Sequence, residues 1–215
     1  MNISASERQA PENNYRSLQK FLLKNTILLR IADSNLISGS YYQNTENFPD
    51  YELKIQELIK KVAFDNEVPL SNIVCYGTSK GGVGALIHGL TGNYPIVTFD
   101  PMINREEYMA NGDEHFCFDC VPVDFTERIN HLLSHTTMCA ENIKIYTCES
   151  VPMTFSYISK LNHEKCEILN VKFDGKAFAN RSEREKHNQF LNLIFPSEAA
   201  DINELLRNCD IDRVR

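Results

Sequence analysis

Ser79 is the residue of this 215-residue chain whose type and surroundings are best suited to covalent chemistry. It lies in Gly77-Thr78-Ser79-Lys80-Gly81, which fits the pattern G-x-S-x-G. A short apolar run, Asn72–Tyr76, precedes the pattern, and apolar residues at helical spacing follow it from Lys80 to Leu90. Strand, tight turn and helix in this order predict a nucleophile elbow with Ser79 at its tip, and with both flanking glycines at positions where a Cβ would clash.

The same turn has a simpler interpretation. A glycine-rich connection between a strand and a helix can hold a phosphate group at the helix N-terminus without any catalysis. The Walker pattern G-x-x-x-x-G-K-[ST] is absent from the chain, so this is not a nucleotide-binding P-loop of that type.

A reactive serine needs a base and a carboxylate, which follow it along the chain in this kind of fold. Glu149 comes directly after the apolar run Ile143–Cys148, where the sheet's C-terminal edge would deliver it beside the elbow. We therefore expect Glu149 to be the acid. Asp100, just after Ile96–Phe99, is the alternative one strand earlier, although an Asp before a proline is also common in turns.

The histidine is harder to place, because the loop 174–181 after the last expected strand contains none. His187 is the first one available. Ser182 and Glu185 have the spacing of a capping box, so a helix should begin before His187 and put it in the second turn. We expect His187 to be the base; an ordinary helix-surface histidine is the other interpretation, and His115 is the second candidate for the base.

An oxyanion formed at Ser79 would need backbone N–H donors. The N–H of Lys80 is the expected first donor, and the second should come from the loop after an early strand, Asn2–Ser4, which makes Ala5 or Ser6 the candidate. The Lys80 side chain could also attract an anionic donor or substrate, since a cation at a helix start is otherwise mildly unfavourable.

One cluster contains residue types that bind metals. His115, Cys117 and Cys120, with Cys139 as a fourth ligand, could form a zinc site, but no second Cys-x-x-Cys or His pair follows at finger-like spacing. We therefore predict no metal. The seven cysteines are odd in number and scattered, which favours reduced thiols and a cytoplasmic protein.

Charge and hydropathy exclude several classes. The net charge of −7 argues against general nucleic-acid binding. No apolar run approaches the roughly 20 residues that span a bilayer, and the first seven residues lack the basic and apolar regions of a signal peptide. We expect neither a transmembrane segment nor a signal peptide.

Apolar runs alternate with helical patterns along the whole chain. The order predicts a mostly parallel sheet of about six strands with helices on both faces, an α/β-hydrolase-like three-layer sandwich. The expected strands are Asn2–Ser4, Thr26–Ile31, Asn72–Tyr76, Ile96–Phe99, Ile143–Thr147 and Ile168–Phe173. The expected helices are Tyr15–Leu23, Tyr51–Phe64, Lys80–Leu90, Asp124–Ser134, Thr154–Leu161, Ser182–Leu193 and Ile202–Asn208.

The length fits one domain, 1–215, because a chain of this size can bury a sizeable core. The segment 101–122 has no strong period and contains Gly112 with several aromatic residues. We expect it to form a lid or insertion over the active site.

The elbow sequence also has a family resemblance. The string from Gly77 to Leu86, continuing through Gly89-Leu90-Thr91-Gly92-Asn93-Tyr94-Pro95, resembles the α/β-hydrolase-type O-acetyltransferases of bacterial capsule loci and a broader family of capsule-biosynthesis proteins. The resemblance extends back to Asn2–Ser4 and Thr26–Tyr42, including Gly39-Ser40-Tyr41-Tyr42.

The resemblance implies acetyl-CoA as the acyl donor, a serine acyl-enzyme, and a sugar hydroxyl of a polysaccharide or oligosaccharide as the acceptor. It also implies that Ser79 is the nucleophile and that Lys80 lies at the site that stabilises the oxyanion. A capsule-synthesis complex would be a partner consistent with it.

Three functions remain open at this stage. The first is a polysaccharide O-acetyltransferase, and the second is an esterase or deacetylase that uses water as the acceptor with the same serine. The third is a catalytically silent, hydrolase-like assembly or binding subunit in polysaccharide biosynthesis, which the absence of a histidine after the last strand would favour.

Overall fold

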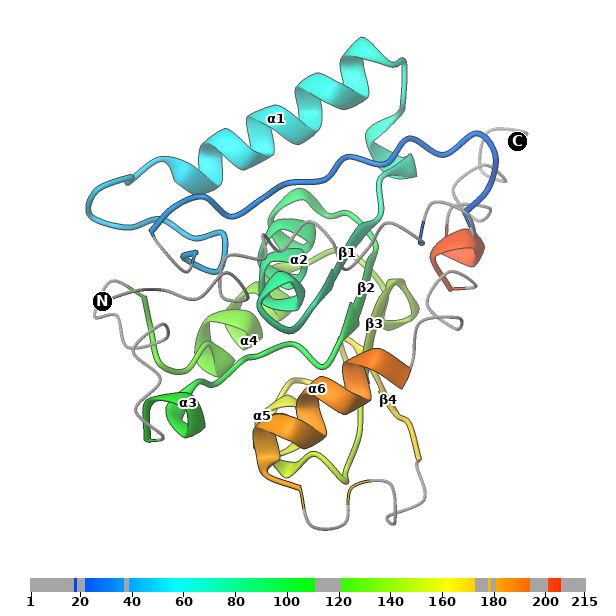
Figure 1. Cartoon of the computed structure of the whole chain (residues 1–215). Coiled ribbons are helices and arrows are strands. Elements are labelled where there is room, and N and C mark those ends of the chain that lie inside the picture. Colours follow the sequence, from blue (N-terminus) through cyan, green and yellow to red (C-terminus); the bar gives the residue numbers. More distant parts are fainter. Residues whose placement is uncertain are drawn as a thin grey trace.

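The computed structural model describes residues 18, 22–36, 39–110, 121–172, 178, 181–193 and 201–205. These residues form an α/β structure around a parallel four-stranded sheet with the strand order β1-β2-β3-β4 (Figure 1). The strands are β1 (Cys75–Thr78), β2 (Ile96–Phe99), β3 (Ile143–Thr147) and β4 (Glu167–Asn170). Because the strands run in the same direction, their C-terminal ends lie along one edge of the sheet, and this edge carries the candidate site.

Helices separate the strands, as the alternating pattern predicts. They are α1 (Tyr51–Asp65), α2 (Ser79–Gly92), α3 (Glu106–Ala110), α4 (Thr126–His135), α5 (Pro152–Ile158) and α6 (Glu183–Leu193), with short 3-10 turns at Leu70–Asn72 and Ala140–Asn142. Residues 201–205 are also helical. No helix among the described residues has the length and apolar character needed to cross a membrane.

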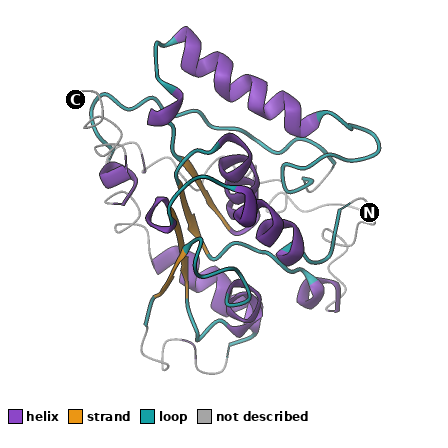
Figure 2. Ribbon diagram, turned by 180° about the vertical axis from the view of Figure 1, so that it is seen from behind, coloured by secondary structure: helices purple, strands orange, loops and turns teal. Residues whose placement is uncertain are grey.

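Two apolar clusters cover the two faces of the sheet. Ile96 of β2 packs with residues of α2, α4 and α5, such as Leu86 and Ile129. Its neighbour Val97 packs on the other side with Phe190 of α6. Successive side chains of a strand point to opposite faces, so a sheet covered on both sides buries the side chain at every position, as in β2. Figure 2 shows the strands between these helices from behind.

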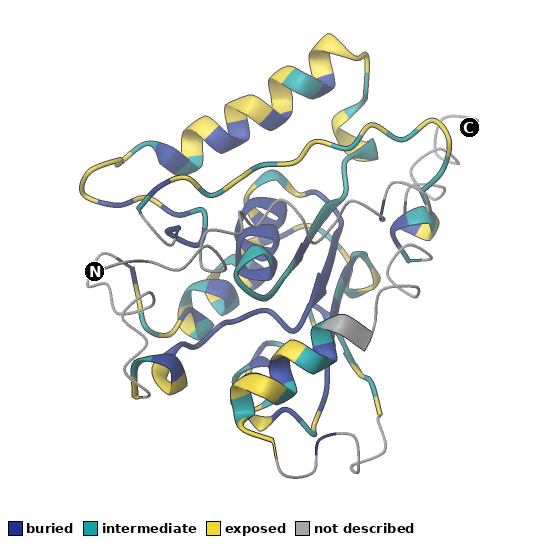
Figure 3. Ribbon diagram, viewed as in Figure 1, coloured by how far each residue is buried: buried dark blue, intermediate teal, exposed yellow. Residues whose placement is uncertain are grey.

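The amphipathic pattern of α1 is confirmed. Its inner residues Tyr51, Ile55 and Ile59 are buried and pack with Tyr94, while Leu53 and Phe64 are exposed. Figure 3 shows this division as one dark and one light side of the helix.

The expected number of strands is not confirmed, because the described residues contain four. Asn2–Ser4 lies outside the described residues. Thr26–Ile31 is described and is not a strand. It lines a cavity of about 770 Å³ together with Cys75 and Tyr76 of β1, and Ile27 is half exposed. An apolar run predicts extended backbone, but a β-strand also needs a neighbouring strand to which its backbone can hydrogen-bond, and Thr26–Ile31 has none among the described residues.

Other boundaries differ by a few residues. The first strand of the sheet, expected at Asn72–Tyr76, begins three residues later and ends two residues later. The last, expected at Ile168–Phe173, begins and ends earlier. Most of the helix expected at Tyr15–Leu23 lies outside the described residues. The expected lid contains α3, while its residues 111–120 are also outside them.

Candidate active site

The turn after β1 has the backbone of a nucleophile elbow. Ser79 has φ 50°, a left-handed conformation that non-glycine residues rarely adopt. Its carbonyl oxygen accepts a hydrogen bond of 3.0 Å from the N–H of Met102, which ties the elbow to the segment after β2. A Cβ on Gly77 would lie 2.0 Å from the carbonyl oxygen of Gly81, so only glycine fits there.

The second glycine of the pattern behaves differently from expectation. A Cβ on Gly81 would meet no atom within 4 Å, so the predicted clash at this residue is wrong. The close approach occurs at Gly82, where a Cβ would lie 2.4 Å from Thr98 Oγ1 and 2.9 Å from Pro101 Cβ. Gly82, and not Gly81, therefore faces the sheet.

His187 lies against Ser79. The predicted capping box at the start of α6 is confirmed: the Glu185 carboxylate accepts from the Ser182 N–H at 2.8 Å, and Ser182 Oγ accepts from the Glu185 N–H at 3.3 Å. The second turn of α6 then brings His187 Nε2 to 3.1 Å from Ser79 Oγ. His187 is 1% exposed, so it is not a surface residue of the helix.

The carboxylate that meets His187 is Asp100. Its Oδ2 lies 2.5 Å from His187 Nδ1, and its Oδ1 accepts hydrogen bonds from the hydroxyls of Thr147 at 3.0 Å and Thr154 at 2.7 Å. Asp100 is fully buried and has φ 41°. A buried carboxylate is costly unless its oxygens are hydrogen-bonded, and the described side chains supply three such contacts.

Glu149, which was expected to be the acid, is placed elsewhere. It is exposed, and its Oε2 accepts from the side-chain amide of Asn170 at 3.0 Å. The reason is the strand order. Asp100 follows β2, the direct neighbour of β1, whereas Glu149 follows β3, one strand further from the elbow, and turns toward β4. In the structure the alternative, Asp100, and not Glu149, lies against His187.

Several other sequence candidates cannot be placed. Ala5, expected as an oxyanion donor, and His115, the second candidate for the base, lie outside the described residues, as do Cys117 and Cys120. Cys139 is exposed with a free thiol. Within the described part of the chain, no group of three or more His, Cys, Asp or Glu side chains could hold a metal ion.

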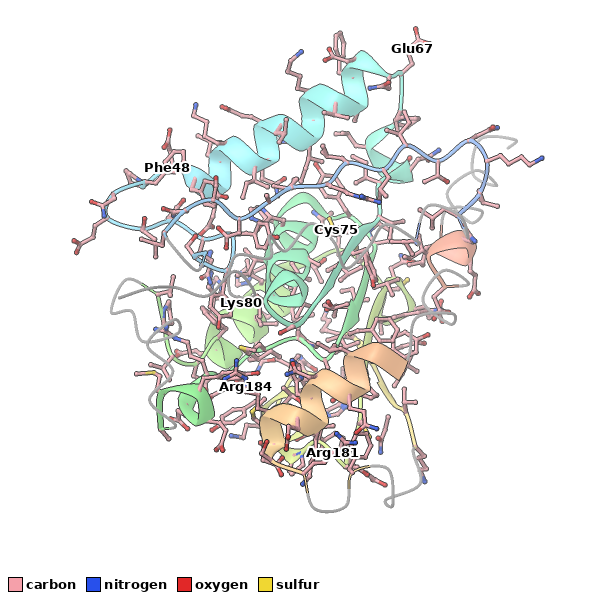
Figure 4. The ribbon with its side chains drawn as sticks, in the orientation of Figure 1. Phe48, Glu67, Cys75, Lys80, Arg181 and Arg184 are labelled. Carbon is pink, nitrogen blue, oxygen red and sulfur yellow. The ribbon has the colours of Figure 1, made fainter. Side chains whose placement is uncertain are left out.

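Two cations lie beside the elbow and the base. Lys80 follows Ser79, and its Nζ lies 5.7 Å from the ring centre of Tyr41. Arg184 is one helical turn before His187, and its guanidinium carbon lies 5.7 Å from the ring centre of Tyr108. Figure 4 labels both cations, which lie on the same side of the molecule near the starts of α2 and α6. Each distance is within the range of a cation–π contact.

The three contacting side chains form a hydrogen-bonded chain from a hydroxyl to a buried carboxylate. The Asp100 oxygen can only accept, so the His187 Nδ1–H donates to it and Nε2 is left to accept the Ser79 hydroxyl proton. Ser79 is only half buried, so a substrate can reach it. This arrangement has the chemistry of an activated serine nucleophile.

Comparison with solved structures finds a capsule O-acetyltransferase of Neisseria meningitidis serogroup A. One structure is 20% identical, covers 72% of this chain and 69% of its own, and has a TM-score of 0.44. A second, in complex with caged gadolinium, is 21% identical with coverages of 72% and 68% and a TM-score of 0.44. A third, a histidine-to-alanine mutant in complex with CoA, is 23% identical with coverages of 71% and 69% and a TM-score of 0.42.

No protein-family model matches the chain, and no curated protein matches it.

Proposed function

We propose that this protein is a serine-dependent O-acetyltransferase that moves an acetyl group from acetyl-CoA to a hydroxyl of a bacterial capsule or surface polysaccharide. The observation that carries the proposal is the hydrogen-bonded series Ser79–His187–Asp100, with His187 and Asp100 buried. This series favours an enzyme over a silent binding subunit, because a subunit that only binds has no need of an aligned hydroxyl, imidazole and carboxylate.

In the first half of the reaction, Ser79 Oγ attacks the thioester carbonyl while His187 Nε2 takes the hydroxyl proton. The Lys80 N–H, in the first turn of α2 directly after Ser79, stabilises the oxyanion. The carbon–sulfur bond then breaks, His187 returns the proton to the leaving thiolate, and acetyl-Ser79 and CoA result.

In the second half, His187 accepts the proton of a sugar hydroxyl, whose oxygen attacks the acetyl-serine. The ester bond to Ser79 Oγ breaks, the proton passes to Oγ, and the acetylated sugar leaves. Asp100 Oδ2 accepts the His187 Nδ1–H throughout, so that Nε2 faces Ser79 in both halves.

The geometry supports acyl transfer, and the resemblance of the Gly77–Leu86 string supports the choice of donor and acceptor. Water in place of the sugar would make the same acyl-enzyme an esterase or deacetylase. Transfer depends on excluding water and holding the acceptor.

The test incubates the protein with acetyl-CoA, with and without short capsule oligosaccharides, and follows free thiol release and the mass of the oligosaccharides. The proposal expects acetylated oligosaccharide and thiol release that depends on the acceptor. Thiol release at the same rate without acceptor would mean a hydrolase, and neither product from a folded protein would contradict the proposal.

A further inference from the structure

A strained turn lies ahead of α1. Gly39 has φ 81°, and two tyrosines of the same turn, Tyr41 and Tyr42, have φ 58° and 61°. Left-handed non-glycine residues each cost of the order of 1–3 kcal/mol and persist only where their surroundings hold them. Such strain points to a functional reason for the backbone conformation.

The carboxylate of Asp33 holds this turn. Its Oδ2 accepts the Tyr42 N–H at 3.0 Å, and its Oδ1 lies 3.5 Å from the Ser40 hydroxyl. A Cβ on Gly39 would lie 2.6 Å from Asp33 Oδ2, so the turn is wrapped closely around the carboxylate. Burial raises the pKa of Asp33, and the hydrogen bond from the Tyr42 N–H opposes this shift.

Tyr42 fixes the turn against α2. A Cβ on Gly84 would lie 2.5 Å from the Tyr42 ring, so glycine is needed for this packing. The Tyr42 carbonyl oxygen lies 2.9 Å from His88 Nε2, one turn further along the helix. The turn therefore lies against the middle of α2.

Tyr41 reaches the elbow itself. Its hydroxyl donates to the sulfur of Met102 at 3.3 Å, and Met102 is the residue whose N–H binds the Ser79 carbonyl. Its ring lies under the Lys80 ammonium group. Tyr41 thus contacts Lys80 and Met102, two residues next to Ser79, near the start of α2.

The backbone N–H groups of the turn divide into two kinds. The N–H of Tyr42 is bound to Asp33, whereas the N–H of Tyr41, directly before it, has no acceptor among the residues that the structure describes. Tyr41 is 2% exposed. A buried N–H without a partner is rare and calls for an explanation, and a negatively charged oxygen of a bound reactant would supply one.

We infer that the Tyr41 N–H is the second oxyanion donor beside the Lys80 N–H, and that Asp33 is the positioning residue that aims it. The inference rests on the proposed role of Ser79 as nucleophile. Asp33 holds the N–H of Tyr42, and the Tyr41 side chain contacts Met102 and Lys80, so the Tyr41 N–H is left beside the elbow, where a tetrahedral oxyanion would form.

The test removes one N–H and keeps the side chain. Incorporation of 4-hydroxyphenyllactic acid at position 41 replaces the amide N–H with an ester oxygen. We expect the rate of fluorophosphonate reaction at Ser79 and the kcat for acetyl transfer to fall about 10²–10³-fold, with little change in KM. The reaction with fluorophosphonate does not depend on the identity of donor or acceptor.

The matched control places the same ester at Tyr94, a buried tyrosine at the far end of α2 whose N–H donates to the Gly89 carbonyl at 2.8 Å. It loses a hydrogen bond that the position-41 ester does not, so it should be the less stable variant and yet react with fluorophosphonate at the parent rate. A position-41 ester that reacts within about twofold of the parent would overturn the inference.

Asp33 is tested by Asp33→Asn, which leaves one acceptor oxygen for the turn in place of two. The control is Asn35→Ala, which removes bonds to Ser40 Oγ and Thr45 Oγ1 in the same loop and leaves the Asp33 carboxylate in place. We expect Asp33→Asn to lower kcat about tenfold with KM nearly unchanged, and Asn35→Ala to lower stability alone. Losses of kcat that simply follow stability in both variants would overturn the positioning role.

Failure of the proposed function is distinguishable from failure of this inference. A parent protein that reacts with fluorophosphonate at Ser79 but transfers no acetyl group would contradict the function, while the effect of the position-41 ester on the reaction rate would still decide the inference. A folded parent that does not react would overturn both.

Discussion

His187 has two ring nitrogens with different partners, and these partners decide its tautomer. Asp100 can only accept, so Nδ1 carries the hydrogen and Nε2 presents its lone pair to Ser79. The hydroxyls of Thr147 and Thr154 hold the other Asp100 oxygen, so the carboxylate cannot rotate away without losing both. In the proposed mechanism, the reactivity of Ser79 therefore depends on groups that never touch the substrate.

The roles of the two carboxylates give the first prediction. In Asp100→Asn, the side-chain amide would donate to Nδ1, which puts the imidazole hydrogen on Nε2, where it cannot accept the serine proton. We expect kcat to fall about 10⁴-fold. Glu149→Gln removes a carboxylate of similar sequence position and should stay within about threefold of the parent. Steady-state measurement of kcat for both variants tests this prediction. A large loss of kcat in Glu149→Gln alone would contradict the assignment of Asp100 as the acid.

The serine could be found from the sequence, because G-x-S-x-G between a strand and a helix is a local pattern. The acid could be narrowed to Asp100 or Glu149, each directly after a predicted strand. Choosing between them requires knowing which strand neighbours β1, and strand order is a property of the packed sheet. The sequence does contain one relevant feature: only one helix and one strand separate Asp100 from the elbow. That feature favours Asp100 only once the strand order is known.

Among the elements, α2 and α6 carry Ser79 and His187 and hold these side chains in contact. The first turn of α2 carries Ser79, and its small residues allow contact with β2 and with Tyr42. The capping box at Ser182 starts α6 one turn and a residue before His187. The sequence predicted this start, but not that α6 crosses the C-terminal edge of the strands with His187 facing inward, because that orientation depends on Phe190 packing against the sheet.

Two neighbouring glycines of α2 give the second prediction. Gly81→Ala adds a methyl group into open space and should change stability by no more than about 1 kcal/mol, in the stabilising direction, because alanine favours a helix. Gly82→Ala forces a methyl group against Thr98 and Pro101 and should destabilise by about 1–3 kcal/mol. Urea unfolding of both variants measures the difference, and equal costs would contradict the packing described for the elbow helix.

A buried histidine on α2 gives the third prediction, on pH. His88 Nδ1 lies 3.1 Å from Gln56 Nε2, which donates to it, and His88 Nε2 faces the Tyr42 carbonyl. Burial lowers the pKa of His88, with Glu52 and Arg128 acting in opposite directions nearby. The unfolded chain therefore binds the proton more readily, so this stabilisation is present above about pH 6.5 and is lost as the pH falls.

His88→Gln keeps an acceptor for Gln56 and a donor for Tyr42 but does not titrate. The free energy of unfolding of the parent should decrease more steeply between about pH 7 and about pH 5 than that of His88→Gln. Parallel stability curves for the two proteins would count against a neutral, buried His88.

At the scale of the whole molecule, the sheet was the most predictable part. Strands β2 and β3 coincide with the expected ranges, since each is a short apolar run between helical patterns. The segment Thr26–Ile31 was misread, because an apolar composition alone does not show whether a neighbouring strand is close enough to pair. The parallel order and the position of the elbow helix followed from the alternation of elements along the chain.

The charge distribution gives the fourth prediction. The chain has a net charge of −7, yet Lys80 and Arg184 flank the site. We expect Arg184→Gln to raise the KM for acetyl-CoA about tenfold and to leave that for the uncharged donor S-acetyl-N-acetylcysteamine unchanged. Lys160→Gln is the matched control, since Lys160 also lies over a tyrosine ring, that of Tyr157, at the end of α5. Equal effects on both donors would contradict an anion-binding role.

The central claim is that a working base activates Ser79 in the folded protein. Intact-protein mass spectrometry after incubation with a serine-directed fluorophosphonate tests it, with Ser79→Ala as the comparison and circular dichroism to establish that both are folded. The account predicts one adduct per chain on the parent protein, located on the Ser79 peptide, and none on Ser79→Ala. A folded parent without an adduct, or an adduct that persists in Ser79→Ala, would contradict it.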